Sequence, residues 1–238
     1  MHDDLNISIR IFAWSVPVIY SITLHEVAHG VVAYYLGDDT AKLAGRLSIN
    51  PIKHVDPLGS LVIPVFLLWL SGFIFGWAKP VPVIEKKLNR PGRDLILVAA
   101  AGPAANLIMS IIWALIMKLG HMLSATQPDV GTVLVYMGAA GIFINAAVLT
   151  LNLLPFPPLD GGRILMGLLP DRFSLVLGKV EPWGFVILVV MILSGFVAKI
   201  IWPIMVVEMA VVTHLVNTPG ELFINALRVL LGETELVQ

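Results

Sequence analysis

The chain has 238 residues, of which 58% are hydrophobic and 13% are charged, and its mean hydropathy is +0.89. These values exclude a single water-soluble domain and a disordered chain, because neither accommodates so much apolar surface. The 15 Lys and Arg residues nearly balance the 16 Asp and Glu residues, so no nucleic-acid partner is indicated. Because the sequence contains no Cys, disulfides and thiolate chemistry are also excluded.

Five apolar segments predict an all-α polytopic membrane protein, because they are long runs rather than short alternating strands. They cover residues 9–36, 58–75, 95–117, 130–154 and 183–216. The intervals between them are too short for a separate soluble module. We therefore expect one membrane-embedded domain over residues 1–238, with a catalytic core at about 9–165 and C-terminal helices at 183–231. Asp3 and Asp4 at the start argue against a cleavable signal peptide.

The last apolar segment is longer than one membrane crossing. As one helix it would span ~51 Å, whereas the hydrocarbon core is ~30 Å thick. Ser194-Gly195, Lys199 and Pro203 are candidate breaks, and two short spans bring the total to about five to six membrane segments. After Pro219, apolar residues recur at helical spacing, which predicts an amphipathic helix at the membrane interface or against the bundle.

The first apolar segment contains the sequence HEVAH. His25 and His29 are four residues apart, which places both imidazoles on one face of a helix. With Glu26 beside them they form the HExxH pattern, in which the histidines bind zinc and the glutamate acts as general base. Two His and one Glu are costly within hydrocarbon unless they bind metal or form pairs, so metal binding is favoured over buried structural histidines.

A catalytic zinc ion usually has three protein ligands, and the residues alone leave the third one open. No His follows His29 at the spacing of the longer HExxHxxGxxH pattern. The candidates elsewhere are His54, Asp56, His121, Asp160, Glu181, Glu208 and His214. Asp160 has an unusual setting, because three prolines and two glycines flank it directly after residues 130–154, where they break the helix. Non-helical backbone at membrane depth is tolerated only in a protein interior or a wet cavity.

Three motifs together resemble the site-2 protease family of intramembrane zinc metalloproteases. They are HEVAH, GPAAN at residues 102–106 and NLLPFPPLDGG at residues 152–162. The flanking sequences resemble a compact prokaryotic branch without PDZ or CBS modules, and the similarity covers roughly residues 20–165.

The resemblance implies a complete catalytic centre. It assigns one Zn²⁺ ion to His25, His29 and Asp160, with Glu26 as general base. It further implies transmembrane proteins as substrates, the lipid bilayer as surroundings and a prokaryotic cell membrane as location.

Four polar residues are candidate substrate contacts. In the family the Asn of the third motif helps to hold substrate, which points to Asn152. Asn145 lies two helical turns before it on the same face, and Asn106 belongs to the second motif, with hydrogen bonds between helices as the alternative for both. His54 is the fourth candidate, with capping of a turn as its alternative.

The implied metal site constrains the membrane topology. Asp160 follows the end of its helix, whereas His25 and His29 lie two-thirds of the way along theirs, so both helices must end on one side. This requires a re-entrant segment near residues 45–84. With re-entry and two C-terminal crossings, one side carries 12 of the 15 Lys and Arg residues, which the positive-inside rule places in the cytoplasm. We expect the N-terminus outside, the active site toward the cytoplasmic leaflet and the C-terminus inside.

The sequence thus predicts an intramembrane zinc endopeptidase that hydrolyses peptide bonds in or near transmembrane helices. A membrane zinc transporter or a non-proteolytic metal-binding membrane protein is the alternative, although a transporter should carry further carboxylates along its helices. Residues 76–84 include AKPVPVI, which forms either an extended edge that binds unwound substrate as an added strand or a proline-stiffened loop. No oligomeric state is predicted.

Overall fold

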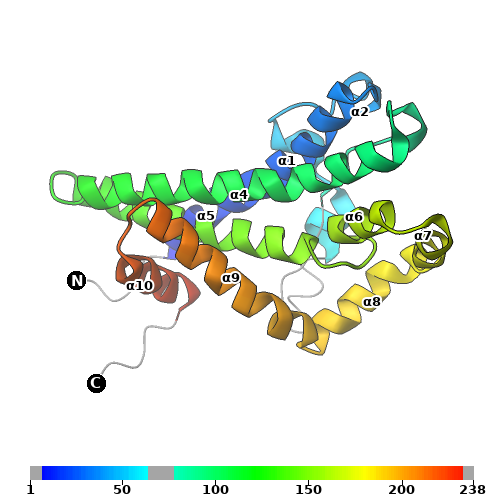
Figure 1. Cartoon of the computed structure of the whole chain (residues 1–238). Helices are drawn as coiled ribbons and strands as arrows, with labels where there is room; N and C mark the ends of the chain where they lie inside the picture. The colour runs from blue at the N-terminus through cyan, green and yellow to red at the C-terminus, as the bar shows by residue number, and fades with distance from the viewer. Residues whose placement is uncertain (1–6, 64–77, 233–238) are drawn as a thin grey trace.

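The computed structural model describes residues 7–63 and 78–232, and its regular structure is helical (Figure 1). The longer helices are α1 (Ile7–Tyr35), α4 (Pro91–Leu123), α5 (Pro128–Asn152), α8 (Glu181–Leu193), α9 (Phe196–Leu215) and α10 (Gly220–Leu231). The shorter elements are α2 (Thr40–Leu43), α6 (Asp160–Leu168), α7 (Asp171–Gly178) and single turns at Pro51–His54, Leu58–Val62 and Glu85–Lys87. No β-strand occurs in the two described ranges, and the all-α prediction is confirmed.

Helices α1, α4, α5 and α9 are each long and apolar enough to cross a membrane. Helices α7 and α8 meet at a bend of 61° and form a fifth span if they are counted together. The apolar runs at residues 9–36, 95–117 and 130–154 correspond to α1, α4 and α5. The chain is therefore an integral membrane protein, as its composition predicts.

The core is built on the antiparallel pair α4 and α5. Small residues let the two backbones approach closely, since a Cβ on Gly138 of α5 would lie only 2.7 Å from Cα of Met117 on α4. Lipid supplies no hydrophobic drive between helices, so close packing of this kind is a main source of helix association in a membrane. Helices α1, α9 and α10 pack onto the pair, and Trp14 of α1 meets Phe143 of α5 edge to face with ring centroids 5.8 Å apart.

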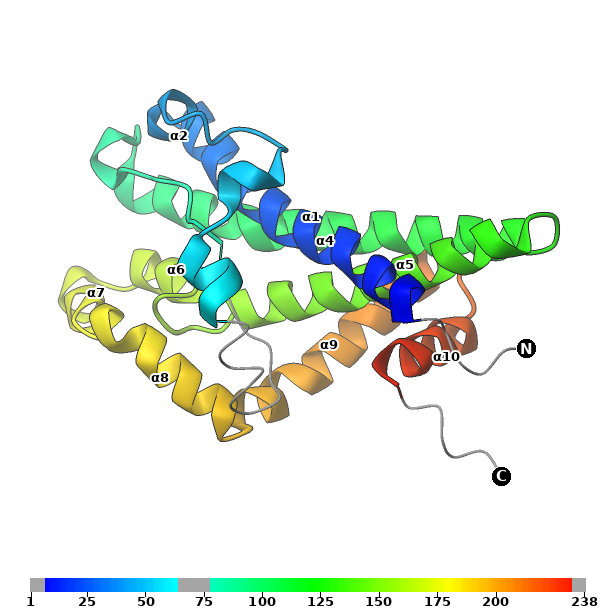
Figure 2. The same ribbon diagram turned by 180° about the vertical axis from the view of Figure 1, so that it is seen from behind.

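The two ends of the bundle carry different elements (Figures 1 and 2). Helices α2, α6 and α7 gather at one end, together with the end of α1 and the start of α4, and we name it the site end. The turn between α4 and α5 lies at the opposite end, which we name the far end, with helix α10 and the start of α1.

The last apolar segment breaks at one of its three candidate positions. Gly195 adopts a left-handed conformation with φ of 73° between α8 and α9, a conformation that glycine accepts without steric cost. Lys199 and Pro203 lie inside α9 and do not end it.

This broken segment makes one traverse of the bundle rather than the two we expected from the sequence. Helix α8 begins at the site end, where a Cβ on Gly184 would lie 2.8 Å from the carbonyl carbon of Pro157. Helix α9 ends at the far end, where the Lys118 ammonium donates to the carbonyl of Val216 at 2.9 Å. The 13 residues of α8 reach only ~20 Å, too short to cross the hydrocarbon core alone. The C-terminal tail consequently lies at the opposite end from residues 37–57, and the expectation that both share one side is wrong.

Helix α10 is the amphipathic helix expected after Pro219. Its apolar face is buried against the far end of the bundle through Phe223, Ala226, Leu227 and Leu230. Of the two alternatives, packing against the bundle is therefore the one the structure shows.

The region near residues 45–84 is described at its two ends. The backbone N–H of Lys79 donates to the carbonyl of His54 at 2.8 Å, so the chain leaves and returns at the same place. Re-entry requires the two ends of this region to lie close together, as they do here. Residues 64–77 lie outside the described ranges, so re-entry stays a prediction. Residues 78–84 form neither helix nor strand, and Ile84 at their end has extended backbone with φ of −108° and ψ of 101°.

Candidate metal centre

Three side chains that are distant in the sequence converge at the site end. His25 and His29 project from α1, and Asp160 is the first residue of α6. Oδ2 of Asp160 lies 3.2 Å from Nε2 of His25 and 3.3 Å from Nε2 of His29, and the two Nε2 atoms are 3.1 Å apart. All three residues are buried, so this cluster is shielded from bulk water.

Helix α4 holds both imidazole rings from behind. The ring of His29 donates from Nδ1 to the backbone carbonyl of Val98 at 2.7 Å, and the ring of His25 donates from Nδ1 to Oδ1 of Asn106 at 2.6 Å. Carbonyl oxygens only accept, so each Nδ1 carries the ring proton and each Nε2 turns its lone pair toward the centre of the cluster. Val98 and Asn106 are eight residues apart on α4, and Gly102 lies midway between them against both rings.

Three acceptor atoms therefore face one another with no proton between them. Two imidazole lone pairs and a carboxylate oxygen repel at such separations unless a cation lies among them. Oδ2 of Asp160 is buried and has no hydrogen-bond donor among the described residues. Tetrahedral zinc with ligands at ~2.0–2.1 Å separates its ligand atoms by ~3.3–3.4 Å, close to the separations found here. The three residues thus fit Zn²⁺ in donor type and in spacing.

A proline-rich loop carries the chain from α5 to Asp160. A Cβ on Gly161 would lie 2.5 Å from the carbonyl oxygen of Leu154, so only glycine lets α6 begin this close to the preceding chain. Asp160 would bind a metal ion as a carboxylate, because a metal ligand must be deprotonated.

A cavity of about 140 Å³ opens onto the three side chains. Glu26 lines it beside the histidines, and its Oε2 accepts a hydrogen bond from the backbone N–H of Val81 at 2.8 Å. The rest of the wall is mostly apolar, with Asn152 and Arg163 as further polar residues.

The four predicted substrate contacts fall into two groups. Asn152 lines the cavity, and its Nδ2 donates to the backbone of its own helix. Asn106 and Asn145 are fully buried outside the cavity wall, where Nδ2 of Asn106 donates to Oδ1 of Asn145 at 2.9 Å, which favours the interhelical alternative. His54 is also buried away from the wall, and its Nε2 donates to the Ser48 carbonyl at 2.9 Å, which favours the turn-capping alternative.

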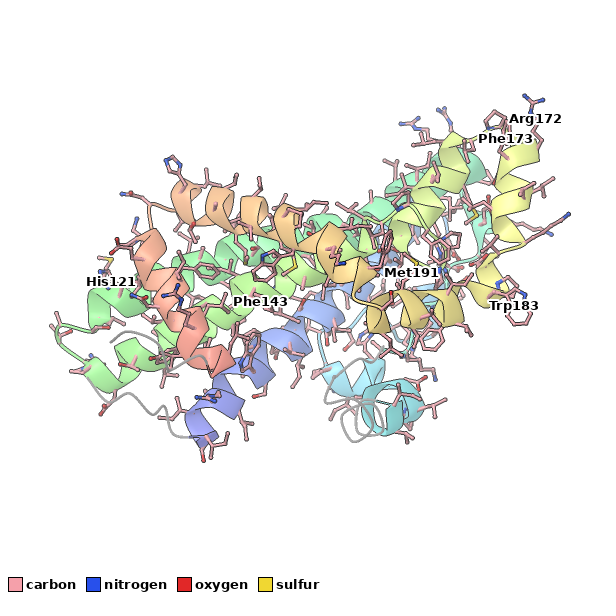
Figure 3. All side chains as sticks on the ribbon, turned by 90° about the horizontal axis from the view of Figure 1, so that it is seen from below. His121, Phe143, Arg172, Phe173, Trp183 and Met191 are labelled. Atoms are coloured by element: carbon pink, nitrogen blue, oxygen red, sulfur yellow. The ribbon has the colours of Figure 1, made fainter. Side chains whose placement is uncertain are left out.

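The other candidates for a third ligand lie elsewhere. Figure 3 shows His121 at the opposite end of the molecule from Trp183 and Arg172. Glu208 and His214 belong to α9, which does not contribute to the cavity wall. Within residues 7–63 and 78–232, His25, His29 and Asp160 form the one cluster of three potential ligands.

Sequence reasoning missed the backbone groups that shape this site. The carbonyl of Val98 orients His29, and the N–H of Val81 contacts Glu26, yet any residue supplies such a carbonyl and any residue except proline supplies such an N–H. Arg163 lines the cavity three residues after Asp160 on α6, and helical spacing would have revealed it, because residues three apart share a face.

Comparisons with known proteins decide the family. Residues 117–195 match Peptidase family M50. The chain is 38% identical over 195 residues to the Bacillus subtilis protein named "Putative zinc metalloprotease YwhC", and the match covers 80% of this chain and 84% of that protein. This chain belongs to peptidase family M50, the site-2 proteases. The resemblance seen in its motifs is therefore confirmed.

Two further relatives of this M50 protease are mycobacterial. The Mycolicibacterium smegmatis and Mycobacterium tuberculosis proteins named "Putative zinc metalloprotease Rip2" are 32% and 28% identical to it. Each match covers 73% of this chain and 64% of the relative, so the M50 protease spans less than two thirds of either Rip2 protein. The comparison with solved structures gave no match. Family membership makes the chain a zinc metalloendopeptidase and sets aside the transporter alternative.

Proposed function

We propose that this metalloendopeptidase hydrolyses peptide bonds in or near the transmembrane helices of membrane proteins. The position of the site carries the proposal. His25, Glu26 and His29 lie within α1, a helix long and apolar enough to cross a membrane, and all three line the cavity that Asp160 completes. The single ligand cluster among the described residues supports one Zn²⁺ per chain.

His25, His29 and Asp160 would hold the ion through two Nε2 atoms and Oδ2. When bound, zinc polarises a carbonyl group and lowers the pKa of water toward 7. Glu26 acts as general base and takes a proton from the attacking water, whose oxygen bonds to the carbonyl carbon of the scissile peptide. Glu26 then gives this proton to the leaving nitrogen as the C–N bond breaks. The products are a new carboxylic acid and a new amine, which become a carboxylate and an ammonium when the second proton of the water passes to the amine, and Glu26 returns to its starting state.

The substrate's own hydrogen bonds bear on the form in which it is cleaved. A transmembrane helix pairs its own backbone groups, so we expect it to unwind locally before cleavage. Residues 78–84 contribute to the cavity wall and offer an edge on which the unwound stretch adds as a strand. Asn152, also on the wall, is placed to contact the unwound backbone.

We further propose that the site faces the cytoplasmic leaflet of a prokaryotic cell membrane. Residues 37–57, 78–94 and 155–182 carry three, five and three of the 15 Lys and Arg residues, and the helices within these stretches gather at the site end (Figure 1). The excess of positive charge favours the cytoplasm for this end.

Metal analysis and peptide cleavage test the proposal together. Purified wild-type protein should bind one zinc ion and cleave at least one peptide in a panel of transmembrane sequences. Glu26→Gln should keep the zinc and lose cleavage, whereas Asp160→Ala should lose both. Cleavage by Glu26→Gln at the wild-type rate would refute the role of Glu26. A wild-type enzyme that cuts soluble peptides and no transmembrane peptide would refute the substrate class.

A further inference from the structure

Three backbone N–H groups fasten residues 78–84 to the rest of the protein. They are the N–H of Lys79 to the His54 carbonyl, of Val81 to the Glu26 carboxylate and of Ile84 to the Asp38 carboxylate, at 2.8, 2.8 and 2.6 Å. The middle bond differs from the other two, because its acceptor lines the metal cavity.

The local sequence leaves Val81 as the one donor at this point. Pro80 and Pro82 flank it, and proline has no N–H and favours extended backbone in the residue before it. The Val81 side chain is buried against α1, since a Cβ on Gly30 would lie 2.9 Å from Cγ1 of Val81. The N–H therefore reaches Glu26 from a stiff and closely packed stretch of chain.

Asp38, which lies outside the cavity, is a second anchor for residues 78–84. Asp38 is fully buried after the end of α1 and accepts hydrogen bonds from Ile84 and from the backbone N–H and the hydroxyl of Thr40. It contributes nothing to the cavity wall. Asp38 thus fixes where residues 78–84 lie along α1 without taking part in the chemistry.

We propose that the backbone N–H of Val81 positions Glu26 for proton transfer. It holds Oε2 in a charge-assisted hydrogen bond and leaves the other oxygen for the proton of the attacking water. Without this bond the glutamate samples several rotamers. The inference rests on the proposed role of Glu26 as base, and it gives residues 78–84 a function in turnover that is separate from substrate contact.

Two substitutions at one position test this separation. Val81→Pro removes the N–H, whereas Val81→Ala keeps the N–H and removes the side chain. We expect Val81→Pro to lower kcat by ~10- to 100-fold with zinc content unchanged and KM within about twofold of the wild-type value. Val81→Ala should lose much less of kcat than Val81→Pro, because it keeps the N–H. Asp38→Ala releases the outer anchor and should also lower kcat less than Val81→Pro does, because the bond from Val81 to Glu26 remains.

Several outcomes would overturn the proposal. An unchanged kcat in Val81→Pro would do so, and so would a rise in KM alone in that variant. An equal loss of kcat in Asp38→Ala would indicate that residues 78–84 have a purely structural role. Glu26→Gln is assayed in parallel, because its continued activity would reject the role of the base itself and not the hydrogen bond.

If Val81→Pro does not fold, hydrogen exchange at Val81 tests whether its N–H is bonded to Glu26. The tripeptide Pro80-Val81-Pro82 contains one backbone amide hydrogen, so its exchange in the intact protein is read without overlap. Glu26→Ala removes the acceptor and should accelerate this exchange by at least ~10-fold relative to the wild type. An unchanged exchange rate would show that the bond does not hold the glutamate.

Discussion

Gly102 is the position at which one methyl group should do most damage to the metal centre. It lies on α4 between the two groups that orient the histidines. A Cβ placed there would lie 2.5 Å from Cε1 of His25 and 2.6 Å from Cε1 of His29, and closer still to Nε2 of His29. Gly102→Ala therefore pushes directly on the atoms that face the ion.

The size of the effect follows from these distances. Carbon atoms in ordinary contact are about 3.5–4.0 Å apart, so the rings or the helix must move by about 1 Å. If α4 retreats, the bonds from His29 to Val98 and from His25 to Asn106 lengthen past the limit of about 3.5 Å and both rings lose their orientation. Loss of such a supporting partner costs about 10- to 100-fold in metal affinity or activity. We expect zinc affinity and cleavage each to fall at least ~100-fold, with an unfolding free energy lower by about 1–3 kcal/mol.

Zinc titration, peptide cleavage and thermal unfolding of the purified variant measure the three quantities. Gly92→Ala is the matched control on the same helix, because a Cβ there meets no other atom within 4 Å. Gly141→Ala is the packing control, since it presses on Trp113 and should lower stability without loss of zinc. Wild-type zinc affinity and turnover in Gly102→Ala would refute the idea that α4 sets the geometry of the site.

Three further outcomes are expected. The donors around Asp38 oppose its burial and lower the pKa of its carboxyl, so its contribution to stability is complete above pH about 4 and is lost as the pH falls through the lowered pKa. The difference in melting temperature between wild type and Asp38→Asn should therefore shrink below pH 4, and a constant difference would contradict this assignment. Removal of zinc by a chelator should abolish cleavage, and zinc at about 100-fold above its Kd should stabilise the wild type by about 2.7 kcal/mol but leave Asp160→Ala unaffected. Reporter fusions within residues 37–57 should report the cytoplasm and a fusion directly after α10 the outside, because α2 and α10 lie at opposite ends of the bundle; any other pair of locations would reject the proposed orientation.

The sequence predicted the long helices well because lipid imposes a simple rule. A segment that crosses the bilayer must be both apolar and continuous, so the runs that became α1, α4 and α5 were visible. The course of α8 and α9 was not, because it depends on a contact between Gly184 and the main chain of Pro157 that no local pattern encodes. The short helices α6 and α7 are too brief and too polar to stand out from their loop.

Prediction of the site succeeded where chemistry requires a particular side chain. The spacing of His25 and His29 placed them together, whereas the residues alone left Asp160 among several carboxylates and imidazoles and the family resemblance selected it. Asn106 was singled out for substrate contact, and the structure instead shows it bonded to His25. The contact between Asn106 and His25 could not be predicted, because it depends on α1 and α4 running antiparallel with Gly102 beside the two rings.

The contacts that α4 makes with the two histidines of α1 have a consequence for the alignment of these helices. Displacing one helix along the other by a single turn, about 5.4 Å, would leave both imidazoles without their acceptors. The two rings therefore take their present orientation only when α1 and α4 are in this alignment.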